Sequence, residues 1–165
     1  MKTTPSRPVL SQTESNTTLW IGHLNHDAND HLAGQTFSCP SDGLLNNIQV
    51  FSAAVTQPGD VLLTMHEFDP LNKTWGPVLM ESRQLIDRAD ESRWIRFNLE
   101  PMNLLQSRHY GFRLQTETGI IGIGEAASHA RKPFSFGQEW SNDPRQLRDN
   151  FYSYFSLAFK VELCA

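Results

Sequence analysis

The sequence predicts an all-β protein: an antiparallel β-sandwich of the jelly-roll type, with about nine strands and one long loop before the last strand. Apolar and polar residues alternate in many short segments, which is typical of strands that bury one face and leave the other in water. Turn-forming sequences rich in proline, glycine and asparagine separate these segments. No long apolar stripe of helical period competes with them.

The alternation is clearest in the last predicted strand. There Phe159 and Val161 share one face, while Lys160 and Glu162 share the other. Earlier segments follow the same pattern, and turn sequences interrupt them at 40–43, 57–60 and 70–73. The predicted strands cover residues 19–22, 33–39, 48–52, 61–65, 78–86, 94–99, 110–116, 120–124 and 154–163.

The length of 165 residues suits one domain. Residues 1–16 are polar and include Pro5 and Pro8, so we expect a flexible N-terminal tail. Residues 17–165 are predicted to form a single soluble jelly-roll domain. Residues 125–150 show no sustained period, apart from a short helical candidate at 143–149. A loop of this length that is rich in aromatic residues is expected to be functional.

Composition bears on the class of partner. The net charge is −4 and the isoelectric point is about 5.8, which argues against nucleic acid because basic patches attract it. No apolar run approaches the roughly 20 residues of a membrane-spanning helix, so no membrane insertion is expected. No signal peptide is visible, which predicts the cytoplasm, or the outside of the cell if the N-terminus was replaced or another export route is used.

The two cysteines, Cys39 and Cys164, are expected to be free thiols. Cys39 follows the inward phase of Phe37, whereas Cys164 is out of phase with its apolar neighbours Val161 and Leu163. A disulfide, the alternative, would need both side chains to face each other.

Several short motifs recur in the same order in a group of bacterial jelly-roll domains. They are Gly34-Gln35-Thr36-Phe37, Asp42-Gly43-Leu44 before Ile48-Gln49-Val50-Phe51, Trp94 to Phe97, Leu104, Tyr110-Gly111-Phe112, Gly137 to Trp140 and Ser156 to Val161. Over residues 32–163 the chain resembles these domains, which are similar to carbohydrate-binding modules and are often appended to extracellular proteins. The resemblance implies a jelly-roll fold and a non-catalytic role in binding a ligand or partner.

The loop at 22–31 concentrates groups that bind metal ions. Its imidazoles and oxygen-bearing side chains are His23, His26, His31, Asp27, Asn29 and Asp30. The histidine spacing matches no recognised ligand motif, so no transition-metal site is predicted. The resemblance adds the hypothesis of a structural calcium ion near Asp27, Asn29 and Asp30, against the alternative of an Asx-rich turn. No other cofactor is expected.

Aromatic residues among polar groups are candidates for a sugar site, because sugar rings stack on Trp and Tyr. Trp75 follows a turn, Trp140 lies in the long loop, and Tyr152 and Tyr154 lie on the outer phase of the last strand. Arg131, in the long loop, is expected to orient the ligand. The alternative is that these aromatic side chains anchor loops or cover a sheet edge.

Three functions follow in order of preference. The first is a non-enzymatic binding module for a carbohydrate or similar polar ligand. The second is a structural or assembly domain that mediates protein-protein contacts or homo-oligomerisation. The third is a glycan-acting enzyme, whose acid pair could come from Glu67, Asp69, Glu81 and Glu125. The sequence brings no two of these together, so no catalytic residue is predicted.

Overall fold

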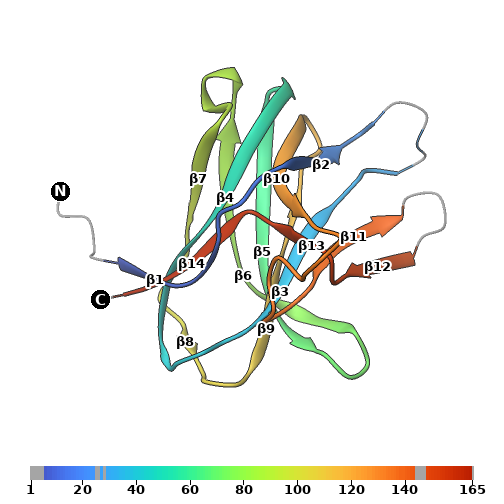
Figure 1. The fold of residues 1–165 in the computed structure, drawn as a ribbon. Helices are drawn as coiled ribbons and strands as arrows, with labels where there is room; N and C mark the ends of the chain where they lie inside the picture. Colours follow the sequence, from blue (N-terminus) through green and yellow to red (C-terminus); the bar gives the residue numbers. More distant parts are fainter. Residues whose placement is uncertain (1–5, 25–26, 28, 144–147, 165) are drawn as a thin grey trace.

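A computed structural model describes residues 6–24, 27, 29–143 and 148–164, and it confirms the all-β sandwich. Two antiparallel sheets of eight and six strands form its two layers (Figure 1). The strands are β1 Ser6–Gln12, β2 Thr17–Gly22, β3 Ala33–Ser38, β4 Gly43–Gln57, β5 Gly59–Asp69, β6 Thr74–Ile86, β7 Arg93–Asn98, β8 Asn103–Leu104, β9 His109–Gln115, β10 Ile120–Ala127, β11 Glu139–Asp143, β12 Arg148–Tyr152, β13 Phe155–Leu157 and β14 Phe159–Cys164.

The first sheet has the order β1-β14-β4-β10-β13, with β2 on β10 and with β7 and β8 on β4. The second has the order β12-β11-β3-β9-β5-β6. Within the described residues the only helical element is the short 3-10 turn η1, Arg88–Asp90. No helix in that part of the chain is long and apolar enough to span a membrane.

The core lies between the sheets and consists of the inward-facing side chains that the alternation in the sequence predicts. Phe159 of β14 is fully buried, and its ring centroid lies 5.8 Å from Phe112 of β9 and 6.5 Å from Phe37 of β3. One side chain of the first sheet therefore contacts two strands of the second. Ile95 and Phe97 of β7 are buried as their alternation predicts.

The strand number is higher than predicted, with fourteen strands in the described residues instead of about nine. Strands β1 and β8 were not expected, and the last predicted strand divides into β13 and β14. The predicted tail is wrong for residues 6–12, because β1 pairs antiparallel with β14, from Ser6 opposite Cys164 to Gln12 opposite Phe159. Residues 1–5 lie outside the described residues.

The long loop is also shorter than predicted. Strands β11 and β12 pair with each other, and β11 adds to β3, where Trp140 lies opposite Gly34. Of the helical candidate at 143–149, the described ends belong to these two strands, and 144–147 lie outside the described residues. Such short strands carry little alternation, so pairing decides their conformation: β11 pairs with β3, and β12 pairs with β11. Cys39 and Cys164 are both free, as expected.

Candidate functional site

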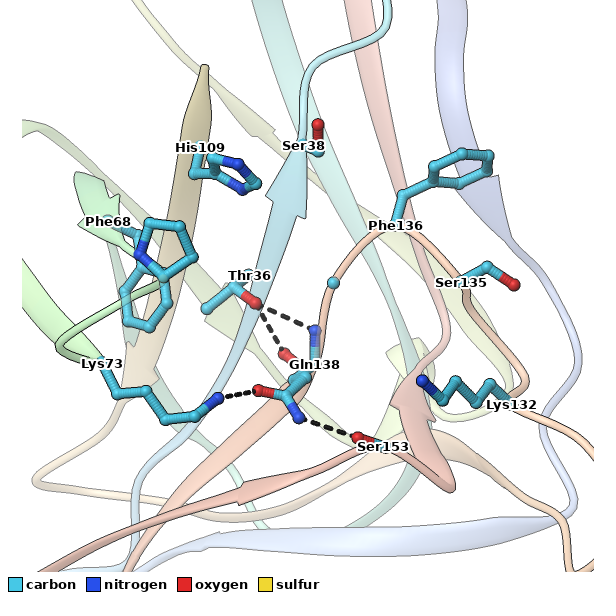
Figure 2. Close-up of a pocket in the computed structure, with 12 residues that line it drawn as sticks. Thr36, Ser38, Phe68, Lys73, His109, Lys132, Ser135, Phe136, Gln138 and Ser153 are labelled. Carbon is cyan, nitrogen blue, oxygen red and sulfur yellow. Dashed lines mark hydrogen bonds between the residues drawn. The ribbon is translucent and has the colours of Figure 1, made fainter. Parts of the chain in front are cut away.

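A cavity of about 460 Å³ opens between β3, the segment before β11 and the turn between β5 and β6 (Figure 2). Its walls combine hydroxyl groups, an amide, two lysines and aromatic rings. They include Thr36, Ser38, Ser135, Ser153, Gln138, Lys73, Lys132, His109, Phe68 and Phe136. We call this space the lysine cavity.

Gln138 holds three parts of the lysine cavity together. Its side-chain Nε2 donates to Ser153 Oγ at 2.8 Å, and its Oε1 accepts from Lys73 Nζ at 2.5 Å. Its backbone N–H donates to Thr36 Oγ1 at 2.9 Å, and the Thr36 hydroxyl donates to the Gln138 carbonyl oxygen at 3.2 Å. These bonds connect β3, the β5–β6 turn and the chain between β12 and β13 (Figure 2).

The charged side chains among the described lining residues of the lysine cavity are all basic. Lys73 and Lys132 contribute two cationic side chains, and no carboxylate is among its described lining residues. Phe136 is 58% exposed, so one aromatic ring faces the solvent beside these polar groups. The arrangement provides hydrogen-bond donors and acceptors, an aromatic face and a positive field, which together suit a polar ligand with negative charge.

Trp140 is buried, which contradicts its predicted role as a stacking platform, whereas Trp75 is half-buried and packs against it, so its predicted role stays a prediction. Trp140 is only 2% exposed, and its ring centroid lies 5.5 Å from that of Trp75. The Arg113 guanidinium lies over both indoles, at 5.0 Å from Trp75 and 5.5 Å from Trp140. The Cβ of an alanine at Gly111 would lie 2.6 Å from Trp75 Cζ3, which shows how closely the indole covers β9. Neither face of Trp140 is free for a sugar.

Tyr152 and Tyr154 do not line the lysine cavity. Tyr154 is 51% exposed and borders a smaller cavity beside β13. Tyr152 is half-buried and its ring centroid lies 5.6 Å from that of Phe155. The structure therefore divides the predicted aromatic site between different surfaces.

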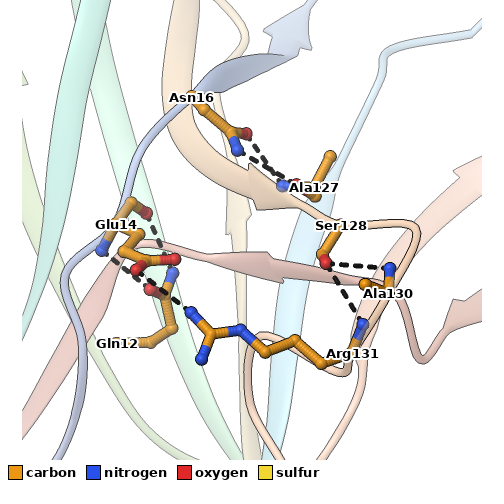
Figure 3. A network of polar contacts seen from close by, with 7 residues as sticks. All are labelled: Gln12, Glu14, Asn16, Ala127, Ser128, Ala130 and Arg131. Carbon is orange, nitrogen blue, oxygen red and sulfur yellow. Dashed lines mark hydrogen bonds and ion pairs between the residues drawn. The ribbon is translucent and has the colours of Figure 1, made fainter.

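Arg131 is exposed and belongs to another polar network (Figure 3). Its guanidinium Nη2 lies 3.6 Å from Glu14 Oε1, and its backbone N–H donates to Ser128 Oγ at 3.3 Å. Nearby, the Asn16 side chain exchanges two hydrogen bonds with the Ala127 backbone. These contacts fasten the chain before β2 to the end of β10, and Arg131 is not among the residues that line the lysine cavity.

The oxygen-rich loop pairs its carboxylates with imidazoles. His23 Nδ1 lies 3.0 Å from Asp30 Oδ1, and His31 Nε2 contacts Asp27 Oδ2. His26 lies outside the described residues. Among the residues that are described, no group of three or more His, Cys, Asp or Glu side chains could hold a metal ion. The calcium site near Asp27, Asn29 and Asp30 stays a prediction.

The structure contains a pair of buried carboxyl groups, of which the sequence suggested only Glu125 as a candidate for an acid pair and missed Glu139. Glu125 of β10 is 6% exposed and Glu139 of β11 is 1% exposed, and the two side chains hydrogen-bond across the sheets. Burial, followed by the contact with Glu125, raises the pKa of Glu139 to about 10. Burial also raises the pKa of Glu125. The pair therefore keeps a proton at neutral pH.

The sequence pattern indicates that one member of this pair, Glu125, is buried. Glu125 follows the inward phase of Ile121 and Ile123, so a carboxylate falls where an apolar side chain is expected. Glu139 offers no comparable signal, because β11 has no recognisable alternation. No family model and no curated protein matches this chain.

Proposed function

We propose that this chain is a non-enzymatic binding module that holds a carbohydrate or similar polar ligand in the lysine cavity. The observation that carries the proposal is the cavity itself, where an exposed Phe136 ring stands beside hydroxyl, amide and ammonium groups. A sugar ring would stack on Phe136, and its hydroxyl groups would hydrogen-bond to Gln138 and Ser153. The resemblance to carbohydrate-binding modules supports the same assignment.

The two lysines narrow the class of ligand. Lys73 and Lys132 face a cavity without a described lining carboxylate, so a ligand carboxylate would gain charge-assisted hydrogen bonds there. We therefore expect oligosaccharides that contain uronic acids to bind more tightly than neutral ones of the same length.

The test is calorimetric titration with neutral and uronic-acid oligosaccharides. Lys132→Ala should weaken binding of the uronic-acid ligand by about tenfold or more, because one charge-assisted hydrogen bond contributes about 1.5–3 kcal/mol. Phe136→Ala should weaken binding of both ligand classes. Arg131→Ala is the matched control, because Arg131 is exposed and not among the lining residues, and it should bind normally. No heat with any oligosaccharide, or an equal loss in Arg131→Ala, would contradict the proposal.

A second candidate function is assembly through the edge strand β6. Among the described strands β6 pairs with β5 alone, so it is an edge strand of the second sheet. Its exposed apolar side chains include Val78 at 52%, Leu79 at 40% and Leu85 at 62%. A second copy could extend the sheet by pairing its own β6 with this edge.

Sedimentation velocity tests the assembly. If β6 joins two copies, the protein will sediment as a dimer, and Leu85→Lys will convert it to a monomer because a charge replaces an apolar contact. Leu71→Lys is the control, because Leu71 is 93% exposed on the β5–β6 turn and should leave the dimer intact. A monomer at every concentration would exclude this function.

A further inference from the structure

A second cavity, of about 220 Å³, lies against the buried carboxyl pair. Its lining residues come from five strands or their ends: Leu19, Glu125, Glu139, Tyr152 and Phe155. Tyr152 lies directly opposite Glu139 in the β11–β12 pair, and Glu125 lies opposite Leu157 of β13. The fold therefore gathers both carboxyl groups and both rings in one place. We call it the carboxyl cavity.

One oxygen atom of the carboxyl pair has no hydrogen-bond partner in the described structure. Glu139 is 1% exposed, and its Oε1 is buried without a hydrogen-bond partner in the described structure. Leaving a buried carboxyl oxygen unpaired costs about 1–3 kcal/mol or more. A ligand that supplies a positive donor at this oxygen would offset that cost, and Glu139 lines the cavity from which such a donor would come.

The remaining walls are apolar and aromatic. The rings of Tyr152 and Phe155 are 5.6 Å apart and meet edge to face, and Leu19 completes the wall. Rings of this kind attract cations through their faces. A bare calcium ion would instead need six or more oxygen ligands. Within the described residues no cluster of three or more potential metal ligands occurs, so the walls favour a cation with apolar substituents.

We propose that the carboxyl cavity binds the ammonium group of a small organic amine against Glu125 and Glu139, with Tyr152 and Phe155 around its alkyl substituents. The proposal is independent of the lysine cavity and of any ligand held there. Binding replaces the proton of the carboxyl pair with the organic cation, so one proton leaves to the solvent for each ammonium bound. Tyr152 is the only other titratable group among the described lining residues.

The experiment compares 3,3-dimethylbutylammonium with 3,3-dimethyl-1-butanol, a neutral molecule in which a hydroxyl replaces the ammonium, by calorimetric titration of the full chain. We expect the ammonium to bind at least about tenfold more tightly, because only this probe brings a positive charge and N–H donors to the carboxyl pair. Repeating the titration in two buffers of different ionisation enthalpy should show proton release. The affinity for the ammonium should rise between about pH 6 and about pH 8, because its binding competes with a proton.

Two variants and one control locate the site. Glu139→Gln keeps the shape of the side chain and should weaken binding of 3,3-dimethylbutylammonium by about tenfold or more. Phe155→Ala acts at a partly exposed wall and should weaken binding even if Glu139→Gln fails to fold. Glu67→Gln, an exposed carboxylate 3.8 Å from Arg108, should leave binding unchanged. Equal affinity for the two probes, no saturable heat with the ammonium, or an equal loss in Glu67→Gln would overturn the proposal.

Discussion

Phe159→Ala is expected to lower the free energy of unfolding by about 3–5 kcal/mol, the range for deleting a large buried side chain. Phe159 is fully buried and packs on Phe37, Phe112 and Phe134, whose ring centroid lies 5.1 Å away. These three residues belong to the second sheet and to the chain before β11, so the lost ring would leave a cavity between the layers. Hydrogen bonds between strands hold the neighbouring backbone in place, so the surrounding residues cannot fill this cavity completely.

Urea denaturation followed by fluorescence measures this change. Phe136→Ala is the matched control, because the same side chain is removed at a position that is 58% exposed. Its effect should stay below about 1 kcal/mol. A loss below about 1 kcal/mol in Phe159→Ala would mean that the two sheets do not pack through this ring.

The stability of the protein is expected to fall as the pH rises from neutral toward 10. The pKa of Glu139 is about 10 in the folded protein, against 4.5 for an ordinary glutamate. Between these values the folded state binds a proton that the unfolded state has released, so each pH unit lowers the free energy of unfolding by up to roughly 1.4 kcal/mol. The contribution of Glu139 to the free energy of unfolding is complete below its unfolded-state pKa of 4.5, and it is lost as the pH rises toward its folded-state pKa of about 10.

Glu139→Gln tests the origin of this pH dependence. The amide cannot release a proton, so the variant should lose stability less steeply between about pH 6 and about pH 9. Unfolding by urea at a series of pH values gives the two slopes. Glu81→Gln, an exposed carboxylate of β6, should keep the slope of the unchanged protein. Parallel slopes for the unchanged protein and Glu139→Gln would show that Glu139 is ionised before unfolding.

The candidate sites were only partly accessible to sequence reasoning. Trp140 stands among polar residues in the sequence, which favours an exposed ligand site, yet it is buried beside Trp75 and under the Arg113 guanidinium of β9. Gln138 stands in a segment without period, so its position at the centre of the lysine cavity depends on β3 and the β5–β6 turn. Exposure at such positions is set by segments that lie far away in the chain.

Alternation along the chain was sufficient to predict the fold class and the inward residues of most strands, such as Ile95 and Phe97, because alternation is a local property of one strand. It could not predict which strands lie side by side. Strand β1 becomes ordered through β14, and β11 through β3. Packing of the two sheets also places Glu139 against Glu125. Alternation assigns a residue to a face, but pairing between distant strands depends on packing that no single segment contains.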